Sequence, residues 1–386
     1  MPANAEQISV KVTELLKYIP GRIVVRRIER PVFKSINSEG EVEIIEALLP
    51  SLPIEKGNAD ASLLAYLIVS KYFDHIPFHR LVKMLKRDNL SLAESTVNGW
   101  FAKVIDLMEP LYEALKKEML QKDYLMADET PIPVLSKNKP GSTHRGYHWV
   151  YYDPLGKSVL FEYQPSRGRE GPDELLKNFE GYLQTDGYTA YNNLSNKDKI
   201  KQLACFAHAR RKFTSAQEND AVRSGKALTY IAGLYAIEQE IREQSLSVDE
   251  IKAVREQKAY PILQEMKAWM DEEAIKILPQ SAIGRAFEYT LKLWPRLIRY
   301  LEDGRLHIDN NPVENTIRPV AVGRKNYLFA GSDDGARRAA IIYSLLGTCK
   351  ARGVDPMAWL TDILNRIPDH KANRLLELLP ESVSMQ

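Results

Sequence analysis

The sequence predicts an α/β protein with a mixed five-stranded sheet and flanking helices, because two stretches of the chain differ sharply in pattern. Between residues 123 and 206, apolar segments of strand length alternate with turn residues and one helical stretch. Residues 208–302 instead show apolar side chains at helical spacing, among them Leu228, Ile231 and Leu234. A large all-helical segment is therefore expected after the sheet.

Composition sets limits on the class of protein. Apolar residues make up 44% of the 386 residues and charged residues 27%, as in ordinary globular proteins. No apolar stretch is long enough to cross a membrane and no secretory signal is present, so a cytoplasmic protein with no membrane contact is expected. The net charge is only +2, so any nucleic-acid surface must be a local basic patch.

The two cysteines are Cys205 and Cys349. They stand far apart in apolar surroundings and show no metal-type spacing, so we expect buried free thiols.

The chain ahead of the sheet divides into two regions. Residues 1–57 are expected to form short strands and loops, with β-branched residues at 23–25 and 42–45. Residues 58–120 are expected to be helical. The helices of this region are placed at residues 61–73, at residues 78–86 and from Ser95 onward, with Ser95 as a possible cap.

The basic helix at 78–86, a brief turn and the helix from Ser95 resemble a helix-turn-helix. The second helix of such a motif enters the major groove of DNA. Generic helical packing produces the same pattern, so both interpretations stay open. Trp100 is expected to be a core anchor rather than a base contact.

The order of strands and helices after residue 120 indicates a particular type of α/β fold. A strand running to Asp128 is followed by a hairpin, a helix and two more strands. These later elements are expected at residues 145–152, 157–163, 172–179, 182–186 and 202–206. Three strands, a helix and two further strands match the ribonuclease-H-like fold, in which metal-binding carboxylates lie on the first strand and just after the fourth.

Three acidic residues occupy informative positions in this pattern. Asp128 ends the first predicted strand, Asp186 ends the fourth, and Glu314 lies near a helix start with Asn311 as N-cap and Pro312 as first helical residue. Carboxylates gathered from such positions can hold two magnesium ions for phosphoryl transfer on a nucleic-acid backbone.

Each acid also has a purely structural interpretation. Asp128 and Asp186 both precede turn-forming residues and can serve as turn formers. Glu314 falls three residues after Asn311, which is the capping-box position. Only the order of the three acids, strand then strand then helix, favours a shared site.

Basic residues cluster near these acids and at the predicted helix-turn-helix, although such clusters are often only solvated helix faces. The candidates for DNA phosphate contacts are Arg80, Lys83, Lys86, Arg87, His208, Arg210, Arg211, Arg318, Arg324 and Lys325.

Several motifs together resemble the insertion sequence 66 transposases of bacteria, which belong to the aspartate-aspartate-glutamate class. The most specific motif runs from Ile308 to Pro319 and continues at Gly323 to Tyr327. The other matching stretches are residues 126–131, 184–191, 204–213 and 353–362. The resemblance covers residues 10–380 in outline.

This resemblance implies that Asp128, Asp186 and Glu314 form a metal-binding triad for two Mg²⁺ ions, with Mn²⁺ as a possible substitute. The implied partner is double-stranded DNA, as terminal inverted repeats and target, bound by a homodimer or higher oligomer, with companion proteins from the same element possible. His208, Arg210, Asn311, Arg318 and Lys325 match motif positions without an assigned role. The family's cysteine-rich zinc-binding segment is replaced by the cysteine-free residues 31–37, so no zinc is expected.

The implied organisation is a catalytic domain at 121–345 with a helical insertion at about 214–302, followed by a C-terminal helical segment at 346–386. The leading hypothesis is a DNA transposase that cleaves and joins element ends. A metal-dependent nuclease without joining activity and a catalytically idle DNA-binding remnant are the alternatives.

Overall fold

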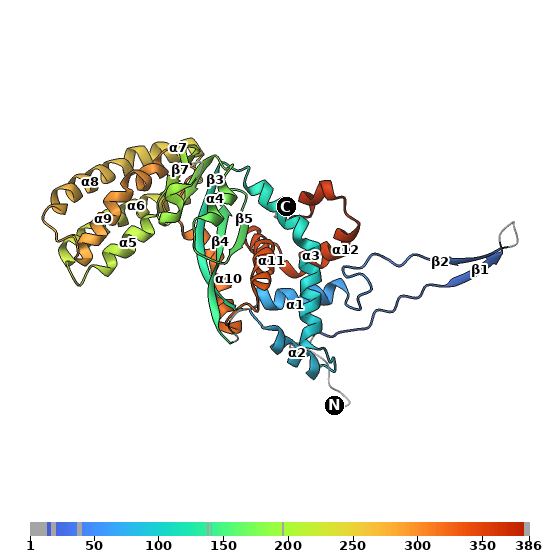
Figure 1. Ribbon diagram of the computed structural model, residues 1–386. Coiled ribbons are helices and arrows are strands. Elements are labelled where there is room, and N and C mark those ends of the chain that lie inside the picture. Colours follow the sequence, from blue (N-terminus) through green and yellow to red (C-terminus); the bar gives the residue numbers. More distant parts are fainter. Residues whose placement is uncertain are drawn as a thin grey trace, which may run out of the picture. The chain divides into compact units, whose positions relative to one another are not determined.

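The computed structural model describes residues 14–16, 21–36, 41–136, 139, 141–194 and 197–381 (Figure 1). The described residues fall into two compact units, within residues 1–50 plus 82–92 and within residues 51–81 plus 93–386. Parts of the predicted N-terminal region 1–57 lie outside the described residues.

The first unit contains a two-stranded antiparallel sheet of β1, Val32–Ile36, and β2, Val42–Glu46. Strand β2 confirms the prediction at residues 42–45. The strand expected at 23–25 is wrong, because none of the described segments pairs with these residues to form the hydrogen-bond ladder that a strand requires.

Three helices precede the main sheet. They are α1, Ala61–Tyr72, α2, Phe78–Arg87, and α3, Glu94–Met119. Helix α3 begins at Glu94 with Ala93 at the N-cap and no side-chain cap, so the predicted capping role of Ser95 is wrong. Trp100 is buried within α3, as expected of a core anchor.

The main sheet has five strands in the order β5-β4-β3-β6-β7. The strands are β3, Tyr124–Leu135, β4, Thr143–Asp153, β5, Ser158–Gln164, β6, Gly181–Gln184, and β7, Ile200–Leu203. Pairing is antiparallel from β5 through β4 to β3 and parallel from β3 through β6 to β7. The mixed five-stranded sheet that the sequence predicts is confirmed.

Strand β3 differs from its prediction in length. It continues seven residues past Asp128, to Leu135, because β4 pairs with it along this whole extension, as far as Leu135 and Thr143. Asp128 therefore lies inside a strand rather than at its end.

Helices flank the sheet on the side of its β5 edge. Helix α11, Asp333–Arg352, packs against β5, and the hydroxyls of Ser344 and Thr348 accept hydrogen bonds from the β5 amides of Phe161 (2.7 Å) and Val159 (3.0 Å). These bonds satisfy donors that an edge strand otherwise leaves open. Helix α12, Pro356–Arg366, packs against α1.

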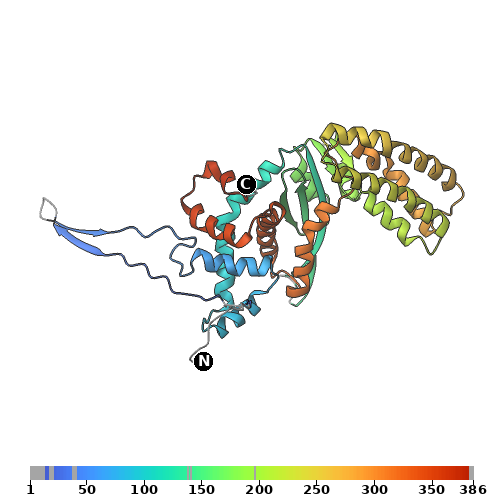
Figure 2. The same cartoon turned by 180° about the vertical axis from the view of Figure 1, so that it is seen from behind.

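The long predicted helical segment is present between β7 and the helix that carries Glu314. Its members pack on one another beside the sheet, as both views show (Figure 1, Figure 2). They are α5, Phe206–Ser215, α6, Ala221–Glu243, α7, Val248–Val254, the π-helical turn η3, Arg255–Ala259, α8, Tyr260–Ala274, and α9, Ala282–Leu297.

Helix α10, Asn311–Tyr327, follows this segment and packs against β3 and β4. The remaining short elements are α4, Glu170–Leu176, and the 3₁₀ turns η1, Thr189–Asn193, η2, Lys197–Lys199, η4, Ile298–Leu301, η5, Ile367–Asp369, and η6, Ala372–Leu378. Among the described residues, no helix is both long enough and apolar enough to span a bilayer.

Candidate acidic site

The register of two parallel strands brings Asp128 and Asp186 to the same place. Met126 on β3 and Gln184 on β6 are the last partners of this pairing. Asp128 and Asp186 each follow two residues later. Because side chains alternate with a period of two along a strand, Asp128 continues the side of the sheet on which Met126 lies. Asp186 lies in the turn that directly follows β6.

Asp128 is strongly perturbed by its surroundings. The pKa of Asp128 is raised to about 8, mainly by burial of the carboxylate and secondly by the neighbouring charge of Glu129. The amide of Glu129 donates to Oδ1 of Asp128 (2.8 Å) and opposes this rise. The charges of Asp186 and Glu314 raise the pKa of Asp128 further, so the three predicted acids lie within electrostatic range of one another.

Asp186 is held in a tight turn after β6. Its Oδ1 accepts a hydrogen bond from the Tyr188 amide (2.7 Å), and Tyr289 on α9 donates to its backbone carbonyl (2.6 Å). Gly187 has φ +91°, and a Cβ at this position would approach Leu293 to 2.6 Å. Only glycine fits here without strain, so the turn that presents Asp186 depends on it.

Glu314 lies in the first turn of α10, but not at the position that the sequence predicts. The N-cap is Asn310 rather than Asn311, Pro312 is the second helical residue, and no side chain caps the helix. Glu314 is therefore one residue beyond the capping-box position. Its Oε1 is buried and has no hydrogen-bond partner. The capping interpretation of Glu314 is wrong.

Glu314 faces the first turns of α5. Nδ1 of His208 lies 3.7 Å from Oε1 of Glu314, and Nη2 of Arg211 lies 3.6 Å from Oε2. Burial lowers the pKa of His208, while the charges of Asp186 and Glu314 raise it. His208 is thus electrostatically linked to two of the three acids.

Asn310 joins the start of α10 to the strand that carries Asp128. This side chain is fully buried, and its Nδ2 donates to the carbonyl of Ala127 (3.0 Å). Its backbone amide donates to Sγ of Cys205 (3.2 Å). Ala127, which precedes Asp128, and Cys205, which precedes α5, are therefore both hydrogen-bonded to Asn310. Asn310 was not among the predicted site residues, although it stands inside the most specific motif.

Asp309 organises the turn immediately before α10. Its carboxylate accepts hydrogen bonds from the hydroxyl of Tyr235 on α6 (2.8 Å) and from the amide (3.1 Å) and side chain (2.8 Å) of Asn311. Asn311 therefore serves the loop geometry here, not the N-cap.

A fourth acid, Glu129, lies beside Asp128 and was not predicted as a site residue. Its Oε1 accepts two hydrogen bonds from the guanidinium of Arg167, which also stacks over the ring of Tyr188 at 4.0 Å. Its Oε2 is buried without a partner. Burial raises the pKa of Glu129, and the bond to Arg167 lowers it. Sequence gave no signal for this contact because Arg167 is 38 positions away.

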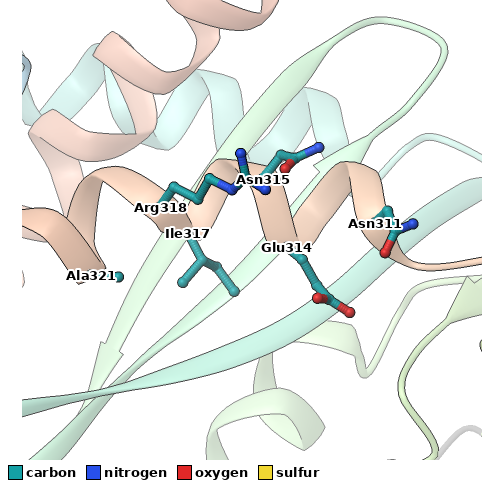
Figure 3. Close-up of a pocket in the computed structure, with 6 residues that line it drawn as sticks. All are labelled: Asn311, Glu314, Asn315, Ile317, Arg318 and Ala321. Carbon is teal, nitrogen blue, oxygen red and sulfur yellow. The ribbon is translucent and has the colours of Figure 1, made fainter. Parts of the chain in front are cut away.

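A pocket runs along α10 and includes Glu314 and Arg318 (Figure 3). Arg318 is exposed one helical turn beyond Glu314. The other residues that line this pocket are Asn311, Asn315, Ile317 and Ala321.

The structure places the predicted phosphate-contact residues in different settings. Most of them are exposed, namely Arg80, Lys83, Lys86 and Arg87 on α2, Arg210 and Arg211 on α5, and Arg318 and Lys325 on α10. Arg324 instead donates to the backbone carbonyl of Pro131 on β3, and His208 is half-buried against Glu314.

Cys205 lies in the same region as His208 and Glu314. One potential ligand atom from each of the three residues lies within 4.8 Å of the other two. Burial raises the pKa of the Cys205 thiol to about 12, although backbone hydrogen bonds oppose this shift. Cys205 and Cys349 are both buried free thiols, as predicted. Cys205 therefore belongs to a group of possible metal ligands that sequence spacing alone does not reveal.

The site so defined is an acidic centre on a mixed α/β sheet, closed by helices from two different parts of the chain. Comparison with known proteins identifies its family. Residues 56–338 match the model of the family described as Transposase IS66 family, and residues 344–380 match the model described as IS66 C-terminal element. This chain belongs to the IS66 transposase family.

Three curated relatives, all from Sinorhizobium fredii, are similar along most of their length. Uncharacterized protein y4jD is 31% identical over 97% of this chain and 75% of its own, and uncharacterized protein y4hP is 32% identical over 98% and 71%. Uncharacterized protein y4qI is 31% identical over 92% and 68%. No solved structure matches the chain at a significant level.

Proposed function

We propose that this chain is a DNA transposase of the aspartate-aspartate-glutamate class whose catalytic carboxylates are Asp128, Asp186 and Glu314. The observation that supports the proposal is that the charges of Asp186 and Glu314, which come from two other segments of the chain, both raise the pKa of the buried Asp128. The buried Oε1 of Glu314, which accepts no hydrogen bond from the described residues, and the raised pKa of Asp128 both support a cation bound among these acids.

The donor set fits divalent magnesium. Carboxylate oxygens are the ligands that this hard ion prefers, and Mn²⁺ accepts the same ligands. Two such ions would stabilise the attacking and leaving oxygens of a phosphodiester during cleavage and joining. Asp128, Asp186 and Glu314 are the residues that would hold the two ions.

The surrounding residues have positioning roles in this proposal. Asn310 ties the Glu314 helix to the Asp128 strand, and Gly187 permits the turn that presents Asp186. Arg211 lies beside Glu314, and Arg318 lies one helical turn beyond it. DNA phosphates would approach both arginines in this proposal. Such fixed geometry is what positional catalysis of phosphoryl transfer requires.

The strand order supports a finer assignment of the fold. Three antiparallel strands, with the first pairing in parallel to the fourth and the fourth to the fifth, form the pattern of the ribonuclease-H-like sheet. In this assignment α6 to α9 are the helical insertion in the catalytic domain at 121–345, with the C-terminal segment at 346–386. The insertion contributes to the site through Tyr289, which bonds the backbone of Asp186, and Tyr235, which bonds Asp309.

The proposed partners are the two ends of an insertion element and a target duplex. The exposed cations of α2, α5 and α10 would contact DNA phosphates, with a homodimer or higher oligomer holding both ends in the cytoplasm. The residues expected to make these contacts are Arg80, Lys83, Lys86, Arg87, His208, Arg210, Arg211, Arg318, Arg324 and Lys325.

An idle DNA-binding remnant is the less favoured alternative. Buried like charges destabilise a fold, and a protein that no longer needs them gains stability by losing one. Asp128, Asp186 and Glu314 are nevertheless all present.

The proposal is tested by strand cleavage and strand transfer on element-end DNA with Mg²⁺. Asp128→Asn, Asp186→Asn and Glu314→Gln remove charge at nearly constant size, and each is expected to lower cleavage about 100-fold or more while DNA binding persists. Asp362→Asn, an exposed acid of α12, is the matched control and should cleave normally.

The possible outcomes separate the hypotheses. Cleavage without any joined product would favour a nuclease. A parent protein that binds end DNA but never cleaves it with Mg²⁺ would indicate the remnant, and undiminished cleavage by the Gln variant would remove Glu314 from the site.

A further inference from the structure

The contact between α5 and α10 contains a mixed set of metal-binding groups that the proposed magnesium chemistry does not use. Sγ of Cys205, a ring nitrogen of His208 and a carboxylate oxygen of Glu314 lie within 4.8 Å of one another. Nδ1 of His208 and Oε1 of Glu314 are 3.7 Å apart. Both of these atoms are buried and neither has a hydrogen-bond partner.

This nitrogen–oxygen separation is suited to a shared cation. Two ligand atoms at about 2.1 Å from one tetrahedral ion stand roughly 3.4 Å apart. A movement of a few tenths of an ångström would therefore allow both atoms to bind the same ion. Without an ion, each atom has lost its contact with water and has in exchange only the other atom, at 3.7 Å, which is too far for a hydrogen bond.

The sulfur of Cys205 lies at the start of α5, next to a backbone donor that precedes α10. Cys205 directly precedes the first residue of α5, and its fully buried Sγ accepts a hydrogen bond from the backbone amide of Asn310 (3.2 Å). A neutral thiol is a weak acceptor, whereas a thiolate at a helix N-terminus is stabilised by such donors. Cys205 and His208 are three positions apart, which brings their side chains to one face of α5.

The chemistry of the donors selects the ion. Magnesium takes oxygen ligands, while zinc and similar ions take thiolate, imidazole and carboxylate together. We propose that Cys205, His208 and Glu314 form a binding site for a thiophilic divalent cation of the zinc type. On binding, the Cys205 thiol releases its proton to solvent, neutral His208 supplies a nitrogen lone pair, and a fourth position stays open.

Occupancy of this site has a consequence for catalysis, which rests on the proposed function. Glu314 belongs to both sets of ligands, so the thiophilic ion withdraws a Glu314 oxygen from the magnesium centre. Zinc-type ions therefore inhibit magnesium-dependent cleavage through Cys205.

Cobalt(II) is the probe for the site itself, because thiolate ligation gives an intense near-ultraviolet charge-transfer band. The full chain titrated with Co²⁺ should develop this band with one equivalent, and Zn²⁺ should abolish it. Cys205→Ser should lose the band, and Cys349→Ser, which changes the other buried cysteine, should keep it. A parent protein without the band, or a band that survives in Cys205→Ser, would overturn the proposal.

A second variant covers the case in which Cys205→Ser does not fold, as judged by its thermal melt. His208→Gln leaves the sulfur in place but removes the imidazole, and it should weaken Co²⁺ binding at least about tenfold. An unchanged affinity in His208→Gln would equally contradict the site.

Activity provides the last measurement. With Mg²⁺ present, micromolar Zn²⁺ should reduce cleavage by the parent and by Cys349→Ser, but not by Cys205→Ser, each compared with its own rate in Mg²⁺ alone. Absent cleavage together with a cobalt band would reject the proposed function and support the site. Normal cleavage without a cobalt band would support the proposed function and reject the thiophilic cation site.

Discussion

Arg255 lies in the π-helical turn η3 with only 3% of its surface exposed, and we predict that Arg255→Met destabilises the helical segment strongly. Its Nε and Nη2 donate to the two carboxylate oxygens of Glu238 on α6, both at 2.8 Å. The remaining N–H groups donate to the carbonyls of Tyr300 (3.0 Å), Asp303 (3.2 Å) and Leu306 (2.9 Å). All five donors of the guanidinium are therefore satisfied.

The magnitude follows from what the substitution leaves behind. Methionine fills most of the space, but Glu238, 5% exposed, loses its only ion-pair partner among the described residues, and three carbonyls lose a donor. Breaking a buried ion pair costs about 3–5 kcal/mol. Replacing both partners, as in Arg255→Met with Glu238→Leu, leaves no unpaired charge. The double variant should therefore recover at least about 2 kcal/mol relative to the sum of the two single changes.

Hydrogen exchange in peptides from α6 and α8 measures this effect locally, without assuming that the whole chain unfolds in one step. Lys258→Met is the matched control, since Lys258 and Glu240 join the same two elements, η3 and α6, but are 43% and 39% exposed. It should be nearly silent. The reasoning fails if Arg255→Met opens no more readily than Lys258→Met, or if the double variant is simply additive.

Three further predictions concern the sheet and the acidic site. Burial lowers the pKa of His148 to about 4, so its contribution to stability is present above pH 6.5 and is lost as pH falls toward 4. Urea unfolding should show the parent losing about 3 kcal/mol more than His148→Gln across this window, and equal slopes would contradict it. Asp128→Asn should raise the melting temperature of the metal-free protein. It should also abolish the stabilisation by Mg²⁺, which in the parent reaches about 2.7 kcal/mol when the Mg²⁺ concentration is one hundred times the dissociation constant. An identical magnesium response in both proteins would argue against Asp128 as a ligand. Asn310→Ala should lower the free energy of unfolding by about 1–3 kcal/mol, because it leaves the Ala127 carbonyl unpaired. Asn310→Asp should lower it further, because it places a second acceptor next to that carbonyl. The opposite order of the two variants in urea unfolding would refute this role of Asn310.

Local patterning was sufficient to predict most elements of the main sheet and of the helical segment that follows it. The five strands and the helical segment were predicted correctly, with boundaries a few residues in error, because each element shows its own apolar period. Asp128, Asp186 and Glu314 stood out for the same reason, since each follows or opens a recognisable element. The motifs also sufficed to indicate the family that the comparisons confirm.

Boundaries that depend on a distant partner were not predictable in this way. Strand β3 runs past Asp128 because β4 pairs with it, and residues 23–25 form no strand because no segment in the described part of the chain pairs with them. Helix α10 begins one residue earlier than expected because Asn310, bonded to Ala127 and Cys205, takes the N-cap position.

The sequence by itself therefore determined the order of elements and the family, and it indicated the three candidate acids, because all of these depend on residues close together along the chain. The tertiary structure alone decided which side chains meet around those acids. Cys205 and Glu314 are more than one hundred positions apart, and so are Asn310 and Ala127. Their contacts arise from the packing of α5 and α10 against the sheet. Burial of apolar side chains brings these distant segments together, and the local sequence pattern of each segment does not show which other segment it will contact.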